Sequence, residues 1–154
     1  MSIRHMAFVV AFVSLGLSQV VGADSLLVGR PLPVVSISGD AGGRLDGSPW
    51  SSTEISGPAL VIVAPQKQLR DAAGRMRDSR SNSDRPVVMI IEMTNGRSDL
   101  RQRAKQRLES LQSDRLTIVI DRNGLAAQAW QATPGSDRFL AIGVGADGTV
   151  ESVR

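Results

Sequence analysis

Continuous apolar runs set the hydrophobic pattern of this chain. Three of them, residues 59–63, 87–91 and 116–120, are short and rich in branched side chains, with turn residues or charges on either side. Runs of this length and composition are typical of strands buried on both faces of a sheet. Residues 139–144 predict a fourth strand, and the Asp-Gly turn after it predicts a hairpin into Val150–Val153.

Helical periodicity fills the intervals between these runs. Apolar side chains recur at helical spacing in residues 66–78 and again after Ser98, which fits an N-cap, while residues 125–131 predict a short third helix. Upstream, residues 34–38 predict a short strand. Strands that alternate with helices predict an α/β protein with a mixed sheet and flanking helices.

Two turn segments separate the upstream strand from the first buried run. The glycine-rich residues 39–43 predict a break in the chain, and residues 46–49 predict the turn of a hairpin.

The beginning of the chain forms a separate block. A short polar stretch precedes an apolar run over residues 6–21, and Val21-Gly22-Ala23 supplies small residues for cleavage before Asp24. This pattern predicts a signal peptide over residues 1–23 and one exported domain, periplasmic or secreted, over residues 24–154. The alternative is a retained membrane anchor, although the run is shorter than the roughly 20 apolar residues that cross a bilayer.

The composition limits the chemistry. The chain has no cysteine, and its single histidine, His5, lies in the predicted leader. The mature domain therefore lacks disulfides, thiolates and the commonest metal ligand. Loss of Arg4 leaves 17 basic against 15 acidic residues, a net charge of +2, which together with only three mature aromatic residues argues against nucleic acid.

Four segments resemble a known family. Residues 29–33 (GRPLP), residues 46–50 with 55–62, and residues 139–142 with 147–150 are similar to the opening, the first strands and the terminal hairpin of the peroxiredoxin-like branch of the thioredoxin superfamily. Residues 120–131 (IDRNGLAAQAWQ) resemble the YtfJ-type group of exported proteins within that branch. The resemblance implies a thioredoxin-like mixed sheet.

The loop after the first buried run departs from that family. In its redox members this loop carries the reactive cysteine at a helix N-terminus, where the helix dipole stabilises a thiolate. Here it reads Ala64-Pro65-Gln66-Lys67-Gln68. We therefore expect no thiol redox activity, catalytic residue, cofactor or metal site. Lys67 is either an anion-binding group at this vacated position or an ordinary surface residue.

The resemblance also implies a helix after the terminal hairpin. The sequence stops at Arg154, so we expect this C-terminal helix to be missing. Either the short third helix shifts to cover the sheet there, or Val144, Val150 and Val153 form an exposed apolar patch. A partner, a second copy or a missing C-terminal extension would then cover this patch.

Other candidate sites each have a structural alternative. Glu54 and Glu92 are a candidate carboxylate pair, and Trp50 and Trp130 mark either a ligand surface or the core. A basic cluster on the second predicted helix either binds an anionic lipid or acidic partner or is a solvated face. Its members are Arg101, Arg103, Lys105 and Arg107.

One further segment is similar to the start of a calcium loop. It reads Asp121-Arg122-Asn123-Gly124, but residue 132 is Ala where that loop needs glutamate. The alternative is a turn in which Asp121 or Asn123 caps the following helix.

These observations predict an exported, non-redox thioredoxin-fold protein that acts as a binding or accessory component. The alternative is a cysteine-independent enzyme or an anion-binding protein that uses the loop at residues 64–68. A carboxylate or lysine pair beside that loop would favour the enzyme. The expected partners are a protein or a second copy of the chain, with no nucleic acid, and a membrane only through an uncleaved leader.

Overall fold

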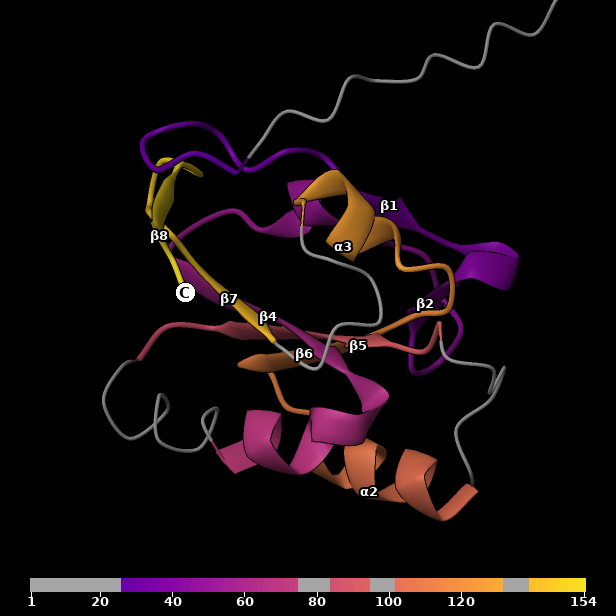
Figure 1. The fold of residues 1–154 in the computed structure, drawn as a ribbon. Coiled ribbons are helices and arrows are strands. Elements are labelled where there is room, and N and C mark those ends of the chain that lie inside the picture. Colours follow the sequence, from indigo (N-terminus) through magenta and orange to yellow (C-terminus); the bar gives the residue numbers. More distant parts are fainter. Residues whose placement is uncertain (1–25, 75–83, 95–101, 132–138) are drawn as a thin grey trace, which may run out of the picture.

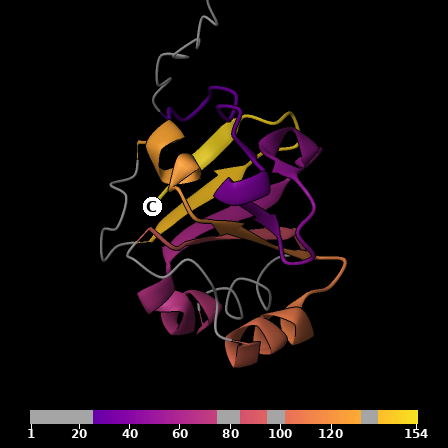
Figure 2. The same ribbon diagram turned by 90° about the vertical axis from the view of Figure 1, so that its right-hand side faces the viewer.

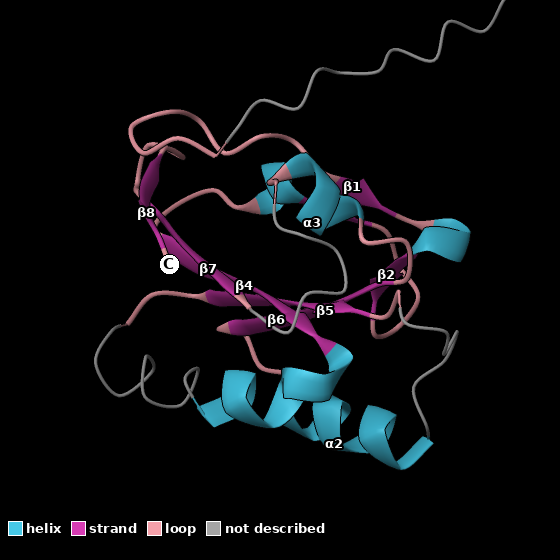
Figure 3. Ribbon diagram, viewed as in Figure 1, coloured by secondary structure: helices cyan, strands magenta, loops and turns pink. Residues whose placement is uncertain are grey.

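The computed structural model describes residues 26–74, 84–94, 102–131 and 139–154, so the predicted leader and its cleavage position lie outside the described residues. A six-stranded mixed sheet crosses the middle of the molecule, with one layer above it and one below (Figures 1 and 3). The strand order is β2-β6-β5-β4-β7-β8.

The three predicted apolar runs form the parallel centre of this sheet. They are β4 (Ala59–Pro65), β5 (Val87–Glu92) and β6 (Leu116–Asp121), with β5 hydrogen-bonded to both neighbours. The predicted hairpin pairs β7 (Leu140–Val144) antiparallel with β8 (Val150–Val153), and β7 joins β4. The sequence prediction of these strands is confirmed, because continuous apolar segments satisfy both buried faces of a central sheet.

Helices cover the two faces unequally. Below the sheet, η3 (Gln66–Gln68) leads into helical residues 69–74, which lie beside α2 (Gln102–Leu111) in two views (Figures 1 and 2). The first of these helical segments connects β4 to β5, and α2 connects β5 to β6. The two connections cross the sheet in the same direction between parallel strands, so right-handed crossovers place both helices on one face. The chain then reverses, which puts α3 (Leu125–Ala129) on the other face. The predicted N-cap Ser98 lies outside the described residues.

Alternate residues of each strand feed two separate cores. In β4, Val61 and Val63 face the α3 layer, whereas Ile62 and Ala64 face the α2 layer. This alternation follows from the two-residue repeat of a strand.

The glycine-rich segment differs from its prediction. Instead of a break, it forms η1 (Gly39–Ala41) and then β2 (Gly42–Arg44), an edge strand antiparallel to β6. A Cβ on Gly42 would lie 2.0 Å from the carbonyl oxygen of Ile120. Glycine therefore permits the close backbone approach that a side chain would prevent.

The chain reverses over residues 44–48, overlapping the turn predicted at residues 46–49, but the reversal does not make a hairpin. The N–H of Gly47 donates to the carbonyl of Arg44 at 2.9 Å, closing the turn. The strands on either side belong to different sheets, because β3 (Trp50–Ser51) pairs with β1 (Ser36–Ile37) and β2 pairs with β6. Local turn chemistry indicated the reversal but not the partner of each strand.

The exposed apolar patch, one of the two alternatives for the terminal hairpin, does not form at two of its three residues. Val144 and Val150 are each 1% exposed, and only Val153, at 38%, is exposed. The N-terminal segment supplies part of the cover, since the N–H of Gly29 donates to Val150 and the N–H of Val150 donates to Arg30, each at 2.8 Å. Leu26 and Leu32 of this segment pack against the core that contains Val144 and Val150.

The opposite face of the hairpin carries small residues. Gly143 pairs with Ser152 there, and Ala141 precedes them along β7. A strand pair with such side chains exposes little apolar surface, so this face does not need the cover that large side chains would require.

None of the helices among the described residues is both long and apolar enough to span a bilayer.

Candidate functional site

The loop at the vacated cysteine position continues the sheet. β4 runs through Ala64 to Pro65, both of which are buried, and η3 begins at Gln66. Lys67 is exposed on η3. The loop contains no side chain that forms a thiolate, and the whole chain has no cysteine. Thiol redox chemistry therefore has no nucleophile here.

Two buried carboxylates end the strands next to this loop. Glu92 is the register partner of both Pro65 on β4 and Asp121 on β6. Glu92 is 5% exposed and Asp121 is 0% exposed. Register partners on adjacent strands point to the same side of a sheet, so the two carboxylates are neighbours on the α3 face.

Desolvation dominates the titration of Asp121. Burial raises the pKa of this carboxyl above its ordinary value of 3.8, and the neighbouring charge of Glu92 acts in the same direction. Hydrogen bonds oppose both effects, because the N–H groups of Leu125 and Ala126 donate to Asp121 at 3.0 and 2.9 Å. The hydroxyl of Thr94 donates to Glu92.

These contacts give the segment 121–124 a structural role. Asp121 caps the first N–H groups of α3, as the capping alternative predicted. The candidate pair of Glu54 and Glu92 does not form, because Glu54 shares a hollow with Pro86, before the start of β5, whereas Glu92 ends that strand. Glu92 pairs with Asp121 instead, beside the loop at residues 64–68, which keeps the enzyme alternative open.

A hollow lies at the end of the parallel strands opposite to these carboxylates. Its volume is about 600 Å³, within the range of small-molecule sites. We call it the Trp50 hollow. Its apolar wall comes from the segment around Trp50 and from the first residues of the strands: Trp50, Ile55, Pro58, Ala59, Pro86 and Val88.

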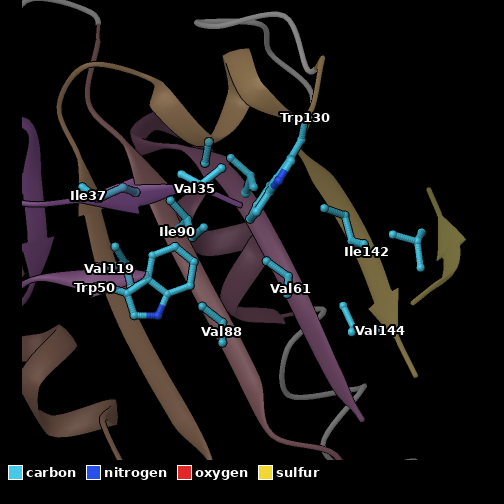
Figure 4. Close-up of a cluster of buried hydrophobic side chains, with 13 residues drawn as sticks. Val35, Ile37, Trp50, Val61, Val88, Ile90, Val119, Trp130, Ile142 and Val144 are labelled. Atoms are coloured by element: carbon cyan, nitrogen blue, oxygen red, sulfur yellow. The ribbon is translucent and has the colours of Figure 1, made fainter. Parts of the chain in front are cut away.

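The tertiary fold buries both tryptophans in one core. In Figure 4, Trp50 lies on the side of Val88 and Val119, and Trp130 on the side of Ile142. The core interpretation is confirmed for both, each being 2% exposed. Trp50 in addition lines the hollow, so the residue belongs both to the core and to the edge of a candidate binding surface.

The rim of the Trp50 hollow carries balanced charge. Arg44 and Arg85 oppose Glu54 and Asp84, and Arg44 forms an ion pair with Glu54 across the lining. Arg85 forms an ion pair with Glu151, and Asp84 forms one with Arg115. Neither partner lines the hollow. Because these charges cancel, the hollow fits an uncharged apolar group better than an ion.

The structure describes four of the five predicted basic residues. Arg103 and Arg107 are exposed on α2, Lys105 is half-buried, and Lys67 is on η3; Arg101 lies outside the described residues. Of the four described, Lys105 lines a second hollow, of about 450 Å³, together with Arg44 and Arg122. We call it the glycine hollow.

Sequence reasoning missed both hollows. Each is built from segments distant along the chain, so neither leaves a motif of fixed spacing. The glycine run at residues 39–43 was the available signal for the second hollow.

Comparison with solved structures tests the fold. The chain is similar to a peroxiredoxin-like protein from Aquifex aeolicus, with a TM-score of 0.56, 14% identity, and coverage of 84% of this chain and 76% of that one. A putative thiol:disulfide interchange protein DsbE from Chlorobium tepidum gives 0.55 at 11% identity, covering 84% and 85%. The thioredoxin domain of a thiol-disulfide oxidoreductase from Bacteroides vulgatus gives 0.55 at 14% identity, covering 84% and 89%.

Comparisons at the level of sequence find no relative of this chain. No protein-family model matches the chain, and no curated protein does. The likeness is therefore one of architecture, and it agrees with the sheet order and the helices described above. This chain is an α/β protein with a thioredoxin-like fold and no cysteine.

Proposed function

We propose that this protein is an exported, non-redox thioredoxin-fold binding component, and that its Trp50 hollow takes up an uncharged, largely apolar group. The observation that carries the proposal is the hollow itself. It has a volume of about 600 Å³, an apolar wall and a rim whose charges cancel. The carboxylate pair beside the loop at residues 64–68 gives less support to an enzyme, because Asp121 caps α3 with both oxygens.

Gly57 offers a way to fill the hollow without disturbing the fold. It lines the hollow, and an added Cβ meets nothing within 4 Å. We expect Gly57→Ala, Gly57→Leu and Gly57→Phe to reduce binding of the neutral fluorescent probe N-phenyl-1-naphthylamine progressively, because each larger side chain occupies more of the space. Gly74→Leu is the matched control, since Gly74 also faces open space but lies outside the lining.

The fluorescence of Trp50 can be measured without that of Trp130. A Trp130→Phe background leaves Trp50 as the only tryptophan, so its emission reports directly on the hollow. Equal probe binding in the Gly57 series and the wild type, or no change in Trp50 emission, would overturn the proposed site.

Export is part of the same proposal and rests on the leader pattern of residues 1–23. N-terminal sequencing of the protein from fractionated cells should begin at Asp24. A membrane-bound species that retains Met1 would contradict export by cleavage.

We also propose membership of the YtfJ-type group, supported by the likeness of residues 120–131. In the structure these residues form the end of β6, the cap at Asp121 and α3.

A further inference from the structure

The glycine hollow has a chemistry of its own. It lies where α2 meets the edge strand β2, and its lining includes Arg44, Lys105 and Arg122 against a single carboxylate, Asp46. Even with Arg44 ion-paired to Glu54, the cations of this lining outnumber its one carboxylate, unlike those of the Trp50 hollow. A concave site with an excess of cations favours an anionic ligand.

The carboxylate in the lining is turned toward its own loop. Oδ1 of Asp46 accepts hydrogen bonds from the N–H and the hydroxyl of Ser48, at 2.9 and 2.6 Å. These bonds lower the pKa of the Asp46 carboxyl, so it is ionised at neutral pH. Its charge is nevertheless partly satisfied by the two donors, which leaves it a weaker competitor for the three cations.

Lys105 is the cation best placed to respond to a ligand. Its Nζ lies 3.9 Å from Glu109 one helical turn away, and both side chains are more than two-fifths exposed. Exposed pairs of this kind contribute little free energy. The ammonium can therefore exchange Glu109 for an oxyanion in the hollow at small cost. Arg44 is held in place by Glu54 on the side of the Trp50 hollow.

Glycines leave the wall of the hollow bare. Gly39 and Gly47, with φ of +58° and +85°, face open space where an added Cβ would meet nothing within 4 Å. Bare backbone lets a ligand approach the main chain closely, as in many phosphate sites.

From these observations we propose that the glycine hollow binds a phosphate-type oxyanion, with Lys105 and Arg122 as its principal cationic contacts. At about 450 Å³ the hollow exceeds a lone phosphate, so the ligand is an organic molecule that carries such a group. This site shares Arg44 with the Trp50 hollow but no other lining residue, and its test does not depend on the apolar ligand proposed above.

The test uses charge-matched variants of the full mature domain. Inorganic phosphate is titrated at constant ionic strength set with chloride, with the amide resonances of Gly39 and Gly47 followed by NMR. We expect saturable shifts of both glycines, and affinities at least about ten-fold weaker in Lys105→Gln and Arg122→Gln, as loss of one charge-assisted hydrogen bond implies. Arg103→Gln removes the same charge from an exposed position of α2 and should bind as the wild type does.

Two outcomes separate a site from general electrostatic attraction. If Arg103→Gln weakens phosphate as much as Lys105→Gln, or if the glycine amides do not move, the proposal is overturned. Phosphatidylglycerol vesicles form a second arm, with phosphatidylcholine vesicles as the control. Lys105-dependent sedimentation with the anionic vesicles would identify the phosphate as that of a lipid headgroup, whereas saturation by free phosphate alone would identify a soluble ligand.

Discussion

The indole N–H of Trp130 donates a 2.9 Å hydrogen bond to the carbonyl oxygen of Pro33, 97 residues earlier in the chain. The bond ties the residue after α3 to the N-terminal segment that covers β8. It also satisfies the polar atom of a side chain that is otherwise in the core.

Trp130→Phe should therefore lower the free energy of unfolding by about 1–2 kcal/mol, because it keeps an aromatic ring but removes the donor and some volume. Urea unfolding of the protein measures this. Trp130→Ala is the reference, with an expected loss of about 3–5 kcal/mol. A Trp130→Phe variant as stable as the wild type would show that the bond to Pro33 is dispensable.

Asp121 predicts an unusual pH dependence. Its folded pKa is raised above the unfolded value of 3.8, so the folded state holds the proton more tightly. The stability that Asp121 contributes through this linkage is present below pH 3.8 and is lost as the pH rises through the folded pKa. The unfolding free energy of the wild type, minus that of Asp121→Asn, should thus be larger in mild acid than at neutral pH.

Asp147 provides the opposite control. The hydroxyl and N–H of Thr149 donate to it at 2.6 and 3.0 Å and lower its pKa. Its contribution is present above pH 3.8 and is lost as the pH falls through the lowered value. The same sign of pH dependence for Asp121→Asn and Asp147→Asn would contradict the environments described here.

Gly43→Ala should be severely destabilising. The residue has φ of +137°, and a Cβ there would lie 2.4 Å from the carbonyl oxygen of Ser48. Strain and clash together predict a loss of more than about 2 kcal/mol in thermal or urea unfolding. Gly57→Ala, which meets no neighbour and has no positive φ, should remain near wild type. Equal effects would mean that the β2 backbone adapts.

Gly74→Ala should raise stability. Gly74 is helical, and an added Cβ meets nothing within 4 Å. Alanine favours the helix over glycine by about 0.5–1 kcal/mol, which a thermal melt should show as a higher Tm. A lower Tm would indicate that the helix requires glycine at this position.

The protein should show no thiol-dependent peroxidase or disulfide-reductase turnover, because the chain has no cysteine to form the thiolate. Standard assays without added protein or metal measure this. Turnover comparable to that of a cysteine-containing thioredoxin-fold enzyme would require a different nucleophile.

Local pattern determined much of the architecture. The apolar runs that became β4, β5 and β6 are buried on both faces, and few other structures accommodate such segments in a domain of this size. The absence of cysteine likewise excluded thiol chemistry before any geometry was known. The sequence indicated Asp121 or Asn123 as a helix cap, because capping depends on residues a few positions apart, and Asp121 takes this role.

Only the tertiary structure decided how distant segments meet. Nothing local shows that Gly42 lies against Ile120, that Glu92 neighbours Asp121, or that residues 26–32 cover Val150. Strand register and long-range packing place these groups, and both depend on the whole set of buried contacts rather than on any short window of sequence. For the same reason, only the fold showed the two hollows and placed Lys105, rather than Arg103 or Arg107, in the lining of one of them.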